Sequence, residues 1–223
     1  MHYRATEQSN RLISPNCLYL VDSGGQYLDG TTDITRTVAI GDSTTEQRAC
    51  YTRVLKGHIA LAVATFPQGT TGTQLDTLAR RPLWEVGLDY DHGTGHGVGA
   101  YLGVHEGPQR ISKSPSSVAL MEGMIISNEP GYYKAGEFGI RLENLVLVVL
   151  ANTHGSLGRE WFGFETLTMV PFDRNLIDQS LLTDKEIQWV NAYHQRVRET
   201  INPLVNSSTY KWLQLVTEPL TPS

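Results

Sequence analysis

Four acidic side chains in this 223-residue sequence have the spacing of a single site. Asp22 and Asp33 are eleven positions apart. Glu129 and Glu143 are fourteen positions apart. Each pair encloses a segment rich in glycine and tyrosine, so both segments share one plan: a carboxylate, a turn, and a second carboxylate on the returning strand. Two such hairpins facing each other would bring all four carboxylates together.

A cluster of four carboxylates predicts bound cations. Like charges that are buried together repel each other by several kcal/mol, as an order of magnitude. Such a cluster is therefore stable only when it surrounds positive charge. Two divalent ions balance four carboxylates, whereas a single zinc ion would be over-supplied with anions. His96, in the run HGTGHGVG, is the obvious nitrogen donor. Ligation mainly by oxygen with one imidazole favours Mn²⁺, with Zn²⁺ or Co²⁺ as alternatives, over structural zinc.

A β-hairpin is expected to carry the two aspartates. The runs at 17–22 and 33–41 both alternate, and a glycine-rich turn follows the first of them. Side chains alternate across a strand. The second run therefore places Asp33, Thr35 and Thr37 on one face and Ile34, Arg36 and Val38 on the other.

The rest of the chain reads as one α+β domain, because no low-complexity linker divides it. Capping boxes and helical apolar spacing predict helices from Thr44 to Phe66 and from Thr183 to just before Pro203. A weaker helix is predicted over 74–86, with Pro82 as a kink or break. Strand patterns occur at 123–128, 139–151 and 161–170.

Composition excludes several classes of protein. With 40% hydrophobic and 18% charged residues, the chain is neither disordered nor collagen-like. A net charge of −5 without a dense basic run argues against nucleic acid and anionic membrane as partners. No apolar run could span a bilayer or serve as a signal core, so a cytoplasmic location is expected. Cys17 and Cys50 are expected to be buried free thiols, and His58 and His194 ordinary helix or loop residues.

Together, these motifs resemble the dinuclear metallopeptidases of the pita-bread fold, and specifically the Xaa-Pro aminopeptidases (aminopeptidase P). The matching motifs occur in a fixed order: Asp22 with DITRT, HGTGHGVG, VHEGP, NEPGYY and GIRLEN. The resemblance implies a creatinase/aminopeptidase-like α+β fold, a curved and mainly antiparallel sheet with helices on its outer face. It makes residues 1–170 a catalytic domain that lacks the family's first elements. It makes residues 171–223 a helical extension packed on that domain.

The resemblance also implies a ligand set for two metal ions. Asp22 and Asp33 would chelate one ion and bridge to the second. His96 and Glu129 would complete the coordination of the second ion, and Glu143 would bridge the two ions. Glu129 would in addition shuttle the proton during peptide hydrolysis.

Further side chains receive roles from the same resemblance. His105 would stabilise the tetrahedral intermediate, while His92 and His2 would line the pocket and contact the substrate. His2 and His105 are therefore also catalytic candidates. Arg141 and Tyr133 would orient carboxylates.

The implied activity is metal-dependent removal of an N-terminal residue from peptides whose second residue is proline, and a homodimer is compatible with it. A prolidase-like dipeptidase is the enzymatic alternative. A non-catalytic pita-bread remnant or binding module is the second alternative, because the family's elements upstream of His2 are not in this sequence. Missing elements would expose apolar surface and sheet edges and lower the stability.

Overall fold

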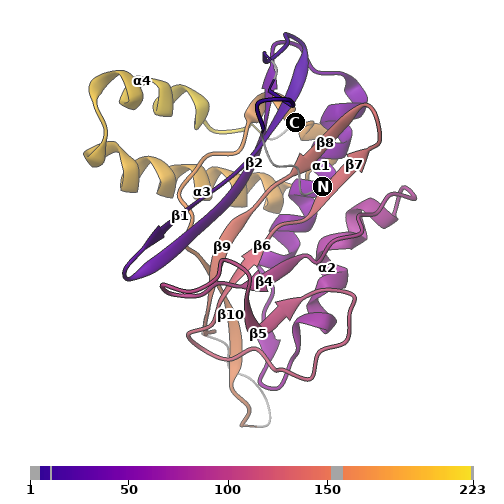
Figure 1. Ribbon diagram of the computed structural model, residues 1–223, viewed down its shortest axis with the longest axis vertical. Coiled ribbons are helices and arrows are strands. Elements are labelled where there is room, and N and C mark those ends of the chain that lie inside the picture. Colours follow the sequence, from indigo (N-terminus) through magenta and orange to yellow (C-terminus); the bar gives the residue numbers. More distant parts are fainter. Residues whose placement is uncertain (1–5, 11, 152–157, 222–223) are drawn as a thin grey trace.

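Antiparallel β-structure and α-helices make up the computed structural model, which describes residues 6–10, 12–151 and 158–221 (Figure 1). Its largest sheet consists, in spatial order, of β3 (Phe66–Pro67), β10 (Trp161–Thr166), β9 (Asn144–Leu150), β6 (Ile125–Asn128), β4 (Gly95–Gly97) and β5 (Glu106–Ile111). Two hairpins accompany it: β1 (Cys17–Tyr27) with β2 (Gly30–Ile40), and β7 (Gly131–Lys134) with β8 (Phe138–Arg141). All of these strand pairs are antiparallel.

The register of the β1–β2 hairpin places both aspartates on one face. Asp22 lies opposite Thr35, and Asp33 lies opposite Gly24. Because directly opposed residues share a face and alternate residues return to it, Asp22, Asp33 and Thr35 point the same way. The predicted hairpin and its polar face are confirmed.

In the described part of the chain, four α-helices accompany the strands: α1 (Thr45–Ala62), α2 (Gly72–Trp84), α3 (Asp184–Ile201) and α4 (Ser207–Val216). Short 3₁₀ turns η1 (Arg174–Leu176), η2 (Gln179–Leu181) and η3 (Asn202–Leu204) flank α3. Figure 1 shows α1 and α2, which contact each other, behind the strands. The capping boxes predicted at Thr44 and Thr183 are both present.

Two helices end differently from the prediction. Helix α1 stops at Ala62, and Phe66 pairs with Phe162 of β10 instead of extending the helix. Helix α2 begins at Gly72 and continues through Pro82 to Trp84. Proline has no N–H to donate to the carbonyl oxygen of residue 78, yet the helix continues for two residues beyond it.

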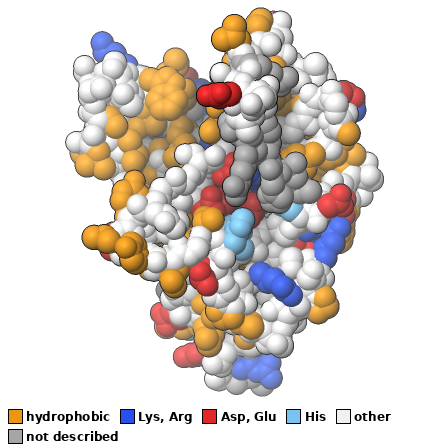
Figure 2. Space-filling view, in the orientation of Figure 1, with side chains coloured by type: hydrophobic (Ala, Val, Ile, Leu, Met, Phe, Trp, Pro, Cys, Tyr) orange, Lys and Arg blue, Asp and Glu red, His pale blue; other side chains and the backbone are white. Residues whose placement is uncertain are grey.

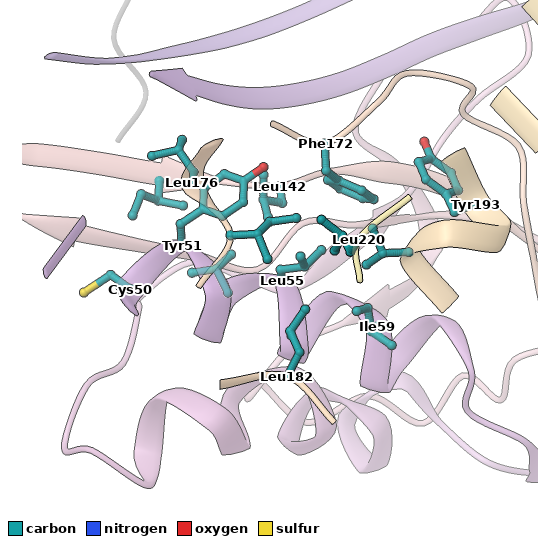
Figure 3. Packing of buried hydrophobic residues seen from close by; sticks show 14 of the residues in the cluster. Cys50, Tyr51, Leu55, Ile59, Leu142, Phe172, Leu176, Leu182, Tyr193 and Leu220 are labelled. Carbon is teal, nitrogen blue, oxygen red and sulfur yellow. The ribbon is translucent and has the colours of Figure 1, made fainter. Parts of the chain in front are cut away.

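The larger of the two apolar clusters among the described residues joins the helices to the strands. Tyr51 and Leu55 of α1 are fully buried against Leu142, Phe172 and other side chains (Figure 3). Helix α3 adds the predicted apolar face, whose buried members are Ile187, Val190 and Val197. Residues on both sides of position 170 therefore share a single core.

The predicted strand over 139–151 is wrong as one element. The chain leaves β8 after Arg141 and enters β9 at Asn144. At this break, the backbone N–H of Glu143 donates to the carbonyl oxygen of Thr35 on β2 at 3.0 Å. A local pattern could not show this contact, because its partner is distant in the sequence. Strand β10 likewise ends at Thr166, before the predicted limit of 170.

Two smaller expectations have a mixed outcome. Both cysteines are free, but only Cys50 is buried; Cys17 is half-buried on β1, a strand with one partner. Exposed apolar surface was the second expectation, and the exposed apolar side chains on the β1–β2 hairpin include Tyr27 and Leu28.

Within the described residues, none of the helices has the length and apolar character to cross a membrane.

Candidate metal centre

A cavity of about 240 Å³ brings together the residues that the sequence analysis singled out. Its side-chain lining consists of Asp22, Asp33, His92, His96, His105, Glu129, Arg141 and Glu143. Acidic and histidine side chains gather near the middle of one face of the molecule in Figure 2. His2, the remaining candidate, lies outside the described residues.

Both hairpins and the large sheet contribute to this cavity. Asp22 and Asp33 come from β1 and β2, and His96 from β4. Glu129 directly follows β6, and Glu143 directly precedes β9. One ligand atom each from Asp33, His96 and Glu143 lies within 4.8 Å of the other two, a spacing that a single cation could bridge.

His96 has the orientation and the surroundings of a metal ligand. Its Nδ1 lies 2.9 Å from the carbonyl oxygen of Gly97, which fixes that nitrogen as a donor and directs Nε2 into the cavity. Nε2 lies 3.2 Å from Oε1 of Glu129 and 3.4 Å from Oδ2 of Asp33. Burial would lower the pKa of His96, but these two carboxylates raise it to about 10. The cluster therefore favours positive charge at this point.

Glu143 provides the test of whether cations fit this site. Its side chain is buried, and Oε2 accepts a hydrogen bond from Oγ1 of Thr35 at 2.6 Å. Oε1 is also buried but has no hydrogen-bond partner among the described residues. Burial, together with the charges of Glu129 and Asp33, raises the pKa of Glu143 to about 8. An unpartnered carboxylate oxygen among other carboxylates is what a bound cation would satisfy, so the residues fit the predicted metal ions.

Arg141 contacts several groups of the cavity. Its Nη2 donates to Oδ2 of Asp22 at 2.6 Å, and its Nε donates to Oγ1 of Thr35 at 3.0 Å. Its Nη1 donates to the hydroxyl of Tyr133 at 3.0 Å, and that hydroxyl lies 3.0 Å from Nε2 of His92. Arg141 thus contacts the carboxylate of Asp22 directly, whereas the hydroxyl of Tyr133 contacts Arg141 and His92. The orienting role of both residues stays a prediction.

The two other histidines occupy different parts of the cavity wall. His105 is exposed, and its ring stands edge-on to that of His96 with centroids 4.3 Å apart. His92 is half-buried, with Nδ1 lying 2.8 Å from the carbonyl oxygen of Gly93. Burial lowers the pKa of His92. A neutral His92 therefore donates through Nδ1 and accepts at Nε2.

Two hydroxyl groups at the site were missed by the sequence analysis. Thr35 links Arg141 to Glu143, as described above. Oγ of Ser127 donates to Oε1 of Glu129 at 3.0 Å and accepts from the backbone N–H of His96 at 2.9 Å. Strand alternation did place Thr35 beside Asp33, which is the signal that could have identified it. Nothing local marks Ser127 beyond its place two residues before Glu129.

Glycines allow the strands around His96 to approach closely. A Cβ atom at Gly95 would lie 1.9 Å from the carbonyl oxygen of Ser127 on β6. A Cβ atom at Gly97 would lie 2.2 Å from the carbonyl oxygen of Glu106 on β5. The alternate glycines of this run therefore allow close backbone packing beside the site.

Comparison with known proteins gives consistent matches. The model of metallopeptidase family M24 matches residues 1–149, and the model of the C-terminal region of peptidase M24 matches residues 160–220. Aminopeptidase P1 of Lotus japonicus is 51% identical over 222 residues, which cover 99% of this chain and 34% of that protein. A probable Xaa-Pro aminopeptidase P of Tuber melanosporum is 52% identical over 225 residues, covering 99% and 36%. The chain thus spans about a third of the length of these curated relatives.

Solved structures agree with the sequence matches. X-prolyl aminopeptidase from Caenorhabditis elegans, described as a cytosolic enzyme with a di-nuclear active site, superposes with a TM-score of 0.92 at 43% identity. That match covers 98% of this chain and 36% of the nematode chain. Prolidase from Pyrococcus furiosus gives a TM-score of 0.62 at 35% identity and covers 73% of this chain and 44% of its own. The predicted pita-bread fold is confirmed, and the chain belongs to metallopeptidase family M24.

Proposed function

We propose that this chain uses two divalent metal ions to hydrolyse the bond between an N-terminal residue and a following proline. The observation that carries the proposal is the convergence of Asp33, His96 and Glu143 on one cavity, with an unpartnered Oε1 on buried Glu143. Relatives that are about half identical to the chain and are called aminopeptidase P or Xaa-Pro aminopeptidase P support the choice of substrate.

Five side chains would hold the metal ions: Asp22, Asp33, His96, Glu129 and Glu143. When bound, the two ions would supply Lewis-acid charge and lower the pKa of a water molecule. Mn²⁺ is the proposed occupant, because four carboxylates and one imidazole form a donor set dominated by oxygen.

The protein's own groups would move the proton and stabilise charge. Glu129 is the proposed proton shuttle, because its carboxylate borders the cavity and is oriented by Ser127. His105, exposed at the cavity wall, would donate to the carbonyl oxygen as negative charge develops there. His92, held by Tyr133, would contact the substrate beyond the scissile bond. The corresponding role of His2 stays a prediction.

An aminopeptidase is favoured over a prolidase by the curated relatives, since those that are about half identical to the chain are called aminopeptidase P or Xaa-Pro aminopeptidase P. The nematode X-prolyl aminopeptidase, which matches 98% of this chain at 43% identity, supports the same choice. We therefore propose peptides longer than two residues as substrates. A non-catalytic role is the alternative that the assay below addresses directly.

The remaining proposals concern organisation and location. We propose that residues 1–170 form the catalytic part and that residues 171–223 support it. A cytoplasmic location is supported by the description of the nematode relative as cytosolic. Nucleic acid and membrane are not expected as partners at a net charge of −5, and a homodimer stays a prediction.

Hydrolysis of an Arg-Pro-Pro peptide in the presence of Mn²⁺ tests the proposal, with an Xaa-Pro dipeptide assayed in parallel. The chain should cleave the longer peptide, whereas Asp33→Asn should be inactive. Asp29→Asn is the matched control, because Asp29 is exposed in the turn of the same hairpin and should leave activity unchanged. Activity in Asp33→Asn, or none in the wild type despite bound Mn²⁺, would contradict the proposal. Cleavage of the dipeptide alone would indicate a prolidase.

A further inference from the structure

Arg36 is a buried cation whose role the proposed ligand set does not explain. It lies on β2 between Thr35 and Thr37, and only 5% of the residue is exposed. Its hydrogen-bond partners in the described part of the chain are all uncharged: the carbonyl oxygens of Thr35, Glu143, Val170 and Pro171, Oδ1 of Asn144 and the hydroxyl of Tyr193. A buried charge is costly unless its donors are satisfied, so this arrangement holds Arg36 in one place.

One side of the guanidinium group binds the backbone next to Glu143. Nη1 donates to the carbonyl oxygen of Glu143 at 2.6 Å and to that of Thr35 at 3.0 Å. Nη2 donates to Oδ1 of Asn144 at 2.7 Å. Arg36 therefore fixes the peptide unit that follows Glu143.

His58 of α1 fixes the peptide unit that precedes Glu143. Burial and the charge of Arg36 lower the pKa of His58 to about 3, so the ring is neutral. Its Nδ1 lies 3.2 Å from the carbonyl oxygen of Leu142, and Nδ2 of Asn144 donates to its Nε2 at 3.2 Å. The backbone of Glu143 is thus held on both sides, while Oε1 of its side chain stays unpartnered.

The other side of the guanidinium group is anchored by the segment 170–172 and by α3. Nε donates to the carbonyl oxygen of Pro171 at 3.1 Å, and Nη2 donates to that of Val170 at 2.7 Å. The hydroxyl of Tyr193 accepts from Nη2 at 3.1 Å and donates to the carbonyl oxygen of Val170 at 2.7 Å.

Aromatic packing completes the anchor. The guanidinium carbon of Arg36 lies 4.4 Å from the centroid of the Phe172 ring. The Phe172 and Tyr193 rings have centroids 5.0 Å apart and are both visible in the core of Figure 3. The anchor therefore belongs to residues 160–220, the part of the chain that matches the C-terminal family model.

We propose that Arg36 is a positioning residue for Glu143, and that the C-terminal segment raises the metal affinity of the centre by anchoring Arg36 through Tyr193. The inference rests on the proposed function only in taking Glu143 as a metal ligand. A ligand that is already held in place loses little conformational freedom when a cation binds, so loosening its support should weaken binding.

Tyr193→Phe is the mildest test, because it removes only the hydroxyl group. The ring would remain stacked on Trp189, whose centroid lies 5.5 Å away in a parallel arrangement. Isothermal titration with Mn²⁺ should show an affinity lower by roughly tenfold, the size typical for loss of a group that supports a metal ligand. Asn191→Ala is the matched control on the same helix: it loses two hydrogen bonds to the main chain of Leu220 and touches no group of the Arg36 network.

Arg36→Lys distinguishes the positioning role of the Arg36 side chain from the effect of its charge. Lysine keeps the positive charge but lacks the planar fork that reaches Glu143, Asn144 and Pro171 together. Its Mn²⁺ affinity should fall at least as far as that of Tyr193→Phe. The electron paramagnetic resonance spectrum of each variant should show more isolated, uncoupled Mn²⁺ than the wild type at the same Mn²⁺ concentration. Circular dichroism measures the folded fraction of each variant.

Equal Mn²⁺ affinities in Tyr193→Phe and Asn191→Ala would overturn the proposal, as would full affinity in Arg36→Lys. A wild-type chain that does not bind Mn²⁺ would overturn both this inference and the proposed function. A chain that binds Mn²⁺ and shows the expected differences without cleaving peptides would contradict the proposed function and support the inference.

Discussion

Thr35→Val removes one buried hydroxyl that links two charged groups of the candidate metal centre. The hydroxyl of Thr35 donates to Oε2 of Glu143 at 2.6 Å and accepts from Nε of Arg141 at 3.0 Å. Valine has nearly the same shape, so the change tests the hydrogen bonds and not the packing. Thr35 is fully buried, and water cannot replace the lost partner.

The expected loss of stability follows from the two groups to which the hydroxyl of Thr35 is hydrogen-bonded. A hydrogen bond to a charged group contributes about 1.5–3 kcal/mol, so the two bonds together should contribute about 4 kcal/mol to the free energy of unfolding. Thr37→Val is the matched control: Thr37 is also fully buried on β2, but its hydroxyl bonds only the backbone carbonyl and N–H of Arg141, each at 3.1 Å. Two neutral hydrogen bonds should contribute about 2 kcal/mol.

Urea unfolding with a chelator present measures these two losses of stability, at a pH above the value of about 8 to which the pKa of Glu143 is raised, so that its carboxylate is charged. Mn²⁺ titration measures the effect on the site. Thr35→Val should be the less stable variant and should bind Mn²⁺ at least about tenfold more weakly, whereas Thr37→Val should keep nearly full affinity. Equal losses of stability and of affinity in the two variants would refute the assignment of Thr35 as the link between Arg141 and Glu143.

Three further predictions concern single substitutions. Glu129→Gln should keep the fold by circular dichroism but abolish peptide hydrolysis, because an amide cannot shuttle a proton; appreciable turnover would contradict this. Gly95→Ala should lower thermal stability by about 1–3 kcal/mol and weaken Mn²⁺ binding, because its Cβ would lie 1.9 Å from the carbonyl oxygen of Ser127. Arg80→Met should destabilise the chain by about 3–5 kcal/mol, because Arg80 is fully buried, pairs with Asp76 and donates to the carbonyl oxygen of His92 at 2.8 Å. KM for the peptide should rise in that variant, because His92 is the proposed substrate contact. An unchanged KM would show that His92 keeps its position without Arg80.

Local patterns were sufficient to predict the parts of the site that lie on regular strands. Strand alternation placed Asp33 and Thr35 on one face, and the register with Asp22 confirms it. Capping boxes located the starts of α1 and α3 because they depend on residues only three positions apart. These features depend on residues that are close together in the sequence, so they can be recognised in a single sequence.

Features that depend on distant partners could not be predicted. Arg36 was placed on the face opposite Asp33, but nothing indicated that it would be buried, since arginine is mostly exposed. Its partners Glu143 and Pro171 lie 107 and 135 positions away. His58 appeared to be an ordinary helix residue for the same reason, and the break before β9 depends on a bond from Glu143 to β2.

Anomalous diffraction from crystals grown with saturating Mn²⁺ tests the central claim most directly. The account predicts two manganese peaks in the cavity lined by Asp33, His96 and Glu143, and the loss of at least one peak in crystals of Glu143→Gln. A single peak, no peak, or ions bound only outside this cavity in the wild-type chain would contradict the assignment of a two-metal centre.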